Sequence, residues 1–391
     1  MEPLLFWPLV AVIFLLMVTV LVAAHEYGHY LFARLFKMEV EEFSIGFGHK
    51  PLFTFHRKGD TAFTVRPWPL GGFVRIKGMV PQPDGSETQV EGGFYSKPPG
   101  HRFWVLLAGP LFSVIAGLLV LIPLYAIVGE PKFATMAVAG EVPAETPAYG
   151  AGLRAGDTIV SVGEKEVSTF YELILVVQDL PERPVDVEFE RAGKRQKVSI
   201  TPIRDKNPMP IRGPDLKFKE EKKIQSRLGI IPAIVNVRLP IHKAAIAALK
   251  EPVKMVTGLY ALFQKPKEIK EQVGGPLAIF YATAEVARTG MDKVFYLTGL
   301  LSIWLGIFNL LPVPLVFDGG HMAVALTEML RGGRRISFRM QSWLAGVGIT
   351  LVAILIVGVM AVDINRFFIE PFTSKKQETT SAKALESPVQ K

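Results

Sequence analysis

Four apolar stretches without a charged side chain dominate this chain of 391 residues. Each is 21 to 26 residues long, and about 20 helical residues cross the hydrocarbon core of a bilayer. The first could be a signal peptide, but no basic residue precedes it and another motif stands where a cleavage site would be. We therefore expect a polytopic α-helical membrane protein with four transmembrane helices: Leu4–Ala24, Phe103–Val128, Val294–Phe317 and Met340–Val362.

The distribution of basic residues predicts the orientation of these helices. No Lys or Arg precedes the first helix, whereas residues 25–102 carry ten of them, and the segment between the last two helices is also rich in Arg. Because short cytoplasmic loops are rich in Lys and Arg, both segments are predicted to be cytoplasmic, with residues 129–293 and both termini outside. The net charge of +8 then reflects this topology and attraction to anionic lipid. No basic patch interleaved with aromatic residues indicates nucleic-acid binding.

The motif His25-Glu26-Tyr27-Gly28-His29 directly follows the first stretch. On a helix, His25 and His29 project from one face, where two imidazoles can bind one Zn²⁺. Glu26 between them can take a proton from a zinc-bound water. The chain has no Cys, which excludes thiolate ligands. The alternative is a metal-free cluster of polar side chains that reach the membrane interface from the end of a span.

Catalytic zinc needs a third protein ligand, and Asp318 is the candidate. It follows the apolar part of the third stretch, after Pro312 and Pro314, which cannot continue a helix. Irregular backbone at membrane depth is tolerated only beside protein or a water-filled cavity, and a carboxylate there is costly and by default a functional candidate. His321 is a rival ligand, for which we favour a role as a helix cap or as a support to the ligands.

These residues together resemble the site-2 proteases, the intramembrane zinc metalloproteases, and specifically the bacterial branch that cleaves anti-sigma factors. The main motifs are His25–His29 and Asn309–Gly320. Supporting matches are Phe43–Gly48, Pro69–Val74, Ala108–Pro110 and Gly275–Leu277. The chain departs from the family in having Phe317 before Asp318, a longer spacing from Pro314 to Asp318, and Ser113 where Asn is frequent. No departure removes a ligand type, so we expect an active enzyme.

The resemblance implies a membrane-re-entrant β-hairpin region at about residues 40–80. Short strands are predicted at Val40–Gly48, Ala62–Arg66 and Gly72–Lys77. An extended substrate would pair with the edge of this region by strand addition, which keeps its scissile bonds unwound. The candidate substrate-binding residues are Gly71, Gly72, Phe73 and Asn309. The alternatives are an ordinary cytoplasmic β-subdomain and an Asn309 amide that only satisfies backbone groups freed at the helix break.

The predicted domains follow the same pattern. Residues 1–130 hold the first two helices, residues 131–204 resemble a single PDZ domain, and residues 205–290 form a linker with juxtamembrane helices. Among these, His242–Phe263 is periodic and amphipathic, and it is expected at the membrane surface or packed on another domain. Residues 291–365 hold the last two helices, and residues 366–391 are a polar, disordered tail. The PDZ domain would bind a peptide or protein, or act as a gate against bulky substrates, and we favour the gate.

The resemblance implies a multi-pass enzyme of the bacterial cytoplasmic membrane with its active site towards the cytoplasmic face. It would hydrolyse peptide bonds within the transmembrane segment of a single-span protein, such as a pre-cleaved anti-sigma factor. One Zn²⁺ held by His25, His29 and Asp318 is the implied cofactor, with Glu26 as the catalytic base. Remnant signal peptides are alternative substrates, and a catalytically inert membrane PDZ adaptor is the alternative function.

Overall fold

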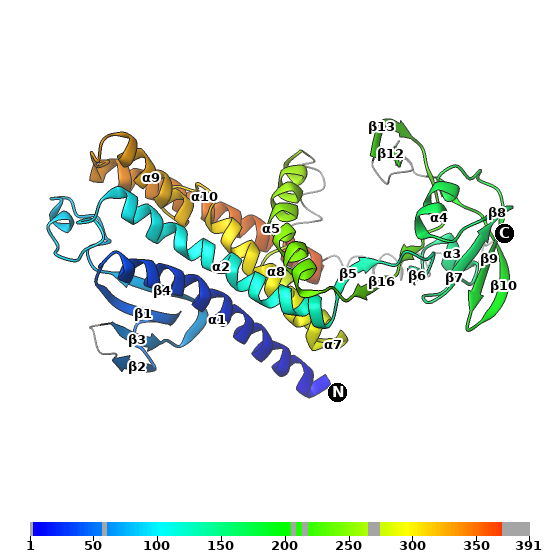
Figure 1. Ribbon diagram of the computed structural model, residues 1–391, viewed down its shortest axis with the longest axis horizontal. Helices are drawn as coiled ribbons and strands as arrows, with labels where there is room; N and C mark the ends of the chain where they lie inside the picture. Colours follow the sequence, from blue (N-terminus) through cyan, green and yellow to red (C-terminus); the bar gives the residue numbers. More distant parts are fainter. Residues whose placement is uncertain (1–2, 57–60, 205–208, 213–217, 265–273, 370–391) are drawn as a thin grey trace, which may run out of the picture. The chain divides into compact units, whose positions relative to one another are not determined.

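The computed structural model describes residues 3–56, 61–204, 209–212, 218–264 and 274–369. The chain divides into two compact units (Figure 1). Unit 1 comprises Met1–Ile127 and Pro240–Lys391, and unit 2 comprises Val128–Leu239. Each unit has its own core, so each is described by itself.

Four helices of unit 1 correspond to the four apolar stretches. By length and composition all four can cross a membrane, which confirms that part of the prediction. They are α1 (Pro3–Leu35), α2 (Pro99–Ile127), α8 (Met291–Asn309) and α10 (Phe338–Ile364). A short π-helical turn, η2 (Asn365–Ile369), extends α10. α2 contacts both α1 and α8, and the three helices lie side by side in Figure 1.

The third apolar stretch is not one continuous helix. α8 ends at Asn309, irregular backbone follows, and a separate helix, α9 (Asp318–Leu330), begins at Asp318. The predicted span Val294–Phe317 is therefore wrong in its C-terminal part, whereas the predicted unwinding at the prolines is confirmed. The physical reason is that proline lacks the N–H that a continuing helix needs. Leu315, with a φ of 50°, turns the chain into α9.

Small residues allow the helices of unit 1 to approach closely. A Cβ on Gly28 of α1 would lie 2.3 Å from the carbonyl oxygen of Ala108 on α2. On the other side of α2, a Cβ on Gly117 would lie 2.6 Å from the carbonyl oxygen of Gly299 on α8. Close backbone contact of this kind holds helices together where burial of apolar surface gives no advantage over lipid.

A four-stranded sheet follows α1. Its strands are β1 (Val40–Phe47), β2 (Phe53–His56), β3 (Ala62–Val65) and β4 (Trp68–Ile76), in the order β2-β3-β1-β4. β1 pairs parallel with β3 and antiparallel with β4, and β2 pairs antiparallel with β3. The region is thus a mixed sheet rather than the predicted hairpin, because Phe53–His56 supplies a fourth strand. β4 is an edge strand and contacts α1 (Figure 1).

The sheet is fixed against the helices by an apolar cluster at the end of α1 and the start of α2. Its buried side chains come from α1, β1, β4, α2 and the segments that precede β1 and α2: Ala33, Met38, Val40, Ile76, Phe94, Tyr95, Val105 and Leu106. The turn that leads from α1 into β1 has Lys37 at a φ of 55°, and the N–H of Met38 donates to the carbonyl of Ala33 at 2.8 Å. Helices commonly end with a residue in the left-handed conformation. Here this residue reverses the chain, so that β1 contacts α1.

Unit 2 is built on a four-stranded sheet with the order β10-β9-β7-β8. The strands are β7 (Thr158–Val162), β8 (Lys165–Glu166), β9 (Val185–Arg191) and β10 (Lys194–Ile200). Two short helices, α3 (Pro147–Gly150) and α4 (Phe170–Val177), pack on a core that includes Leu153, Ile159 and Phe189. The buried carboxylate of Asp157 accepts two hydrogen bonds from Arg191, at 2.7 and 2.8 Å. β9 and β10 pair antiparallel as a hairpin that turns at Gly193.

The compact part of unit 2 continues beyond residue 204, where the predicted domain ends. Strands near Leu239 pair back onto strands that follow α2. The pairs are β15 (Ile231–Pro232) with β6 (Ala139–Glu141), and β16 (Ile234–Val237) with β5 (Glu130–Phe133). Further short pairs are β11 (Ile203–Arg204) with β14 (Ser226–Arg227), and β12 (Met209–Arg212) with β13 (Phe218–Lys223).

Two further helices lie in the described part of unit 1. α5 (Ile241–Phe263) packs on α2 and buries Ala244, Ala248 and Met255, whereas the apolar face with Leu249 and Val253 is exposed. α7 (Pro276–Thr289) begins at Pro276, directly after Gly274 and Gly275. The buried Asp363 of α10 accepts hydrogen bonds from the backbone N–H groups at the start of α7. The predicted disordered tail, residues 366–391, is wrong for residues 366–369, which belong to η2 and continue α10, and the rest of it lies outside the described residues.

The 3₁₀ turn η1 (Ser86–Thr88) lies in the segment before α2 and contains a buried glutamate, Glu87. Glu87 pairs with Arg335 at 2.6 Å, and its side chain is 3% exposed. Burial raises the pKa of Glu87, but hydrogen bonds from Arg335 and from backbone N–H groups outweigh burial, so the pKa lies below its ordinary value. The charged carboxylate therefore stabilises the fold above the unfolded-state pKa, and this contribution is lost as the pH falls through the lowered pKa.

We predict that Glu87→Gln lowers the free energy of unfolding at pH 7 by about 1–3 kcal/mol, because Arg335 loses its charged partner. The difference from the wild type should shrink as the pH falls from about 5 to about 3. Thermal unfolding of both proteins in detergent across this range checks the prediction. A difference that stays constant down to pH 3 would contradict it.

Candidate metal centre

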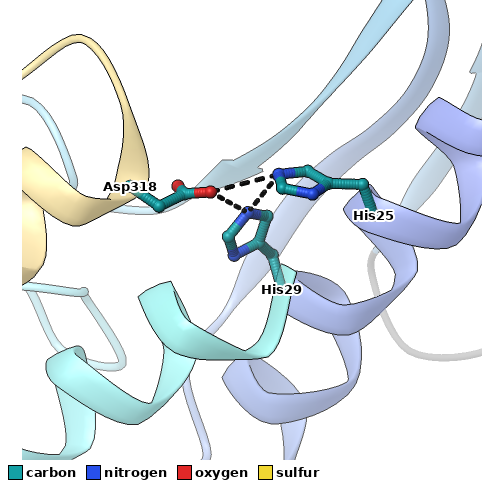
Figure 2. A group of neighbouring side chains, drawn as sticks. All are labelled: His25, His29 and Asp318. Atoms are coloured by element: carbon teal, nitrogen blue, oxygen red, sulfur yellow. Dashed lines mark hydrogen bonds and ion pairs between the residues drawn. The ribbon is translucent and has the colours of Figure 1, made fainter. Parts of the chain in front are cut away.

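Three side chains from two segments of unit 1 converge on one point (Figure 2). His25 and His29 lie one turn apart on α1, and Asp318 is the first residue of α9. The Nε2 atoms of the two histidines are 3.2 Å apart. Asp318 Oδ2 lies 3.1 Å from Nε2 of His25 and 3.4 Å from Nε2 of His29.

This triangle fits a zinc ion. Donor atoms at about 2.0–2.2 Å from tetrahedral zinc are roughly 3.3–3.6 Å apart, near the three separations in the structure. With neutral imidazoles, Asp318 Oδ2 is a buried acceptor without a hydrogen-bond partner. A buried unpaired carboxylate oxygen is unfavourable, and a cation at the centre of the triangle would satisfy it. Two imidazoles and one carboxylate also form a donor set that catalytic zinc uses.

The other ring nitrogens of both histidines are held by α2. Nδ1 of His29 lies 2.8 Å from the carbonyl oxygen of Val105, to which it can donate. Nδ1 of His25 lies 2.9 Å from Ser113 Oγ. The carbonyl of Ser113 accepts a hydrogen bond from Ser302 Oγ on α8 at 2.7 Å. Outer contacts of this kind fix the ring orientation and tautomer, so that Nε2 presents its lone pair to a metal.

Glu26 lies beside the edge strand of the sheet. Its carboxylate lies near the backbone of Val74 on β4. A Cβ on Gly72 would lie 3.4 Å from Cγ of Glu26 and 2.9 Å from a methyl carbon of Val22, so β4 passes α1 at close range. The predicted residue Gly72 therefore lies near the motif. Phe73 turns its ring towards Phe47 and two arginines, and Gly71 lies against the ring of Phe47.

Two predicted or rival residues have other partners. The side-chain N–H of Asn309 donates to the carbonyl of Leu305 at 3.0 Å, a bond within α8 that fits its structural alternative. The ring of His321 lies near the backbone of Leu315 in the irregular segment. His321 is not part of the three-residue group in the described chain. A role of His321 as a helix cap or as a support to the ligands stays a prediction.

The spacing from Pro314 to Asp318 is longer than in the family, and two glycines after Asp318 explain how its carboxylate still reaches the histidines. A Cβ on Gly319 would lie 2.3 Å from the carbonyl oxygen of Leu310, and one on Gly320 would lie 2.0 Å from that of Val313. The irregular segment therefore folds directly onto the start of α9. With Leu315 in the left-handed region, the four-residue step from Pro314 to Asp318 brings Asp318 to both histidines.

The backbone groups at this site could not be predicted from the residue types. The carbonyl of Val105 and the backbone of Val74 contact His29 and Glu26, yet any residue type offers the same groups. Ser113 has a sequence signal only in comparison with the family, in which Asn is frequent at its position.

The sequence matches peptidase family M50 over residues 13–355. Among similar proteins, the regulator of sigma-W protease RasP of Bacillus subtilis is 27% identical, with 91% of this chain and 98% of that protein aligned. Zinc metalloprotease RasP of Geobacillus kaustophilus is 26% identical over 91% of this chain and 98% of its own length. A PDZ domain from Listeria monocytogenes aligns with 26% of this chain at 17% identity and a TM-score of 0.19, too low to carry an argument about the fold.

The close approach of α2 to His29 yields a prediction. A Cβ on Gly109 would lie 2.2 Å from Nε2 of His29, so Gly109→Ala must displace the ring. We expect the variant to bind zinc and cleave substrate at least about 10-fold less well than the wild type.

The matched control is Gly346→Ala on α10, where a Cβ meets nothing within 4 Å. Zinc per chain and peptide cleavage, measured on both variants, check the prediction. Equal zinc content in Gly109→Ala and Gly346→Ala would show that the ring position does not govern binding.

Proposed function

Because the chain belongs to peptidase family M50 and is an intramembrane zinc metalloprotease, we propose that His25, His29 and Asp318 hold its zinc ion and that Glu26 is its catalytic base. The observation that carries this proposal is the triangle of two imidazole nitrogens and one carboxylate oxygen, with separations of 3.1 to 3.4 Å. When bound, the zinc ion lowers the pKa of a water ligand towards about 7 and polarises the substrate carbonyl.

Glu26 moves the proton. It follows His25 directly on α1, and its side chain lies against β4, next to Gly72 and Val74. Its carboxylate takes a proton from the attacking water and passes it to the amine that leaves. His25 and His29 serve as ligands rather than bases, since the Nε2 atoms of both rings lie in the triangle that would hold the metal.

The edge of β4 is the proposed substrate platform. A transmembrane helix shields its carbonyls in hydrogen bonds, so the segment must unwind before water can attack. An unwound segment leaves backbone groups without partners, and an edge strand offers them. Gly72 keeps this edge close to Glu26, since its lack of a side chain lets β4 approach α1. Gly71 and Phe73 would then shape the strand rather than contact the scissile bond.

The proposed substrates are single-span membrane proteins that have already been shortened outside the membrane, with an anti-sigma factor as the first choice. The similarity to a protein named regulator of sigma-W protease supports this choice. Remnant signal peptides present the same chemistry. The proposed location is the bacterial cytoplasmic membrane, with the centre towards the cytoplasm and unit 2 and both termini outside. An inert adaptor is disfavoured, because an inert protein has no need of oriented outer contacts to both histidines.

Unit 2 is the proposed PDZ-type gate. Its sheet and two helices suit such a domain, and it is inserted between α2 and α5, at the side on which substrates with large outer domains would arrive. To exclude bulky substrates, unit 2 needs only to be stably folded on that side. To bind a peptide, it would also need an accessible sheet edge.

We predict that Glu26→Gln keeps zinc at about one ion per chain and abolishes cleavage, because glutamine cannot accept the proton. Asp318→Ala should lose most of the zinc, because one of three protein ligands is gone. Metal analysis and cleavage of a transmembrane test peptide check both variants.

Full activity of Glu26→Gln would contradict the assignment of the base. Unchanged zinc in Asp318→Ala would point to His321 or another residue as the third ligand. His321→Ala is the matched comparison and should retain zinc.

The gate predicts a dependence on substrate size. Two substrates with one transmembrane segment, one with a short outer stub and one with a folded outer domain, should differ at least 10-fold in cleavage rate. Asp157→Asn, which weakens the bond to Arg191 inside unit 2, should speed cleavage of the bulky substrate and leave the short one unchanged. Equal exclusion of the bulky substrate by both proteins would argue against the gate.

A further inference from the structure

A buried ion pair joins α2 to α9 at a distance from the metal centre. Arg102 Nη2 and Glu328 Oε2 are 2.5 Å apart, with side-chain exposures of 4% and 0%. Removing two charges from water is costly, and well-packed apolar residues often stabilise a fold equally well at such positions. Stability alone is therefore a weak reason for this pair, and its location suggests another one.

Each partner lies on a helix that builds one side of the metal centre. Arg102 precedes Val105 by one turn of α2, and the carbonyl of Val105 binds His29. Glu328 lies ten residues after Asp318 on α9, which is about 15 Å along a helix. The ion pair therefore connects the helix that orients the histidines to the helix that carries the carboxylate.

α9 depends on such an anchor because its other end is not continuous with a helix. It is joined to α8 through the irregular residues 310–317. At the far end, Glu328 Oε1 accepts a hydrogen bond from the backbone N–H of Ile336 at 3.0 Å, in the turn towards α10. The guanidinium of Arg102 also lies 5.0 Å from the ring centre of Tyr95, whose hydroxyl is 3.1 Å from Gln341 Oε1 on α10.

We propose that Arg102 and Glu328 are positioning residues, whose ion pair fixes α9 on α2 and so holds Asp318 against His25 and His29. This inference rests on the proposed ligand set. Its physical basis is the stiffness of a helix: a slip of α9 by one residue moves Asp318 by about 1.5 Å. Zinc–ligand distances tolerate only about 0.2 Å, so even a small shift of the anchor weakens the site.

Two variants test the inference. Glu328→Gln removes one charge, and the double variant Arg102→Met with Glu328→Met removes both and leaves no unpaired charge to unfold the protein. We expect both to bind zinc about 10- to 100-fold more weakly in competition with a chelator, with a lower kcat and an unchanged KM. The thermal midpoint of the double variant should stay near that of the wild type.

Asp157→Asn is the matched control, since it weakens another buried carboxylate–arginine pair, in unit 2, and should leave zinc affinity unchanged. Wild-type zinc affinity and kcat in a folded double variant would overturn the positioning role. Asp318→Ala distinguishes a failure of the positioning role from a failure of the proposed ligand set. If Asp318→Ala loses zinc while the double variant does not, only the positioning role fails. If Asp318→Ala keeps zinc, the ligand set fails and the positioning role with it.

Discussion

The close contact between α1 and α2 is the constraint on which the rest of the structure depends. Gly28 and Gly109 bring the two backbones so near that a methyl group on either glycine would overlap the facing helix. At this distance Val105 and Ser113 of α2 reach Nδ1 of both histidines. A wider separation would leave the imidazoles free to rotate, and lipid offers no polar group to replace these contacts. The metalloprotease thus obtains a rigid two-histidine face from helix packing.

The third corner of the site requires the opposite property, a break in regular structure. Asp318 can reach α1 only because α8 ends and α9 begins a new direction. Such a break exposes backbone groups that lipid cannot satisfy. Gly319 and Gly320 reduce this cost by letting the irregular segment pack against α9, and the ring of His321 lies near the backbone of that segment. The ion pair at the far end of α9 completes a helix that is held at both ends.

Residues with distinctive chemistry were predictable from the sequence, and contacts made by ordinary backbone were not. Two histidines one turn apart, two prolines in an apolar stretch and an isolated carboxylate each have few explanations. The backbone groups of Val74 and Val105, which lie beside Glu26 and His29, are not marked by any residue type. β2 was missed because four residues carry little periodicity. For α5 the apolar face was predictable but its surroundings were not, since periodicity cannot distinguish a face that meets protein from one that meets lipid.

Two imidazoles of α1 and the carboxylate of α9 are proposed to hold one zinc ion. X-ray absorption at the zinc edge of the purified protein identifies the ligands, because imidazole and carboxylate ligands scatter differently. We expect two imidazole nitrogens with oxygen ligands at about 2.0–2.2 Å, and no sulfur. A spectrum that requires three imidazoles would contradict it, because Asp318 would then be displaced by a third histidine.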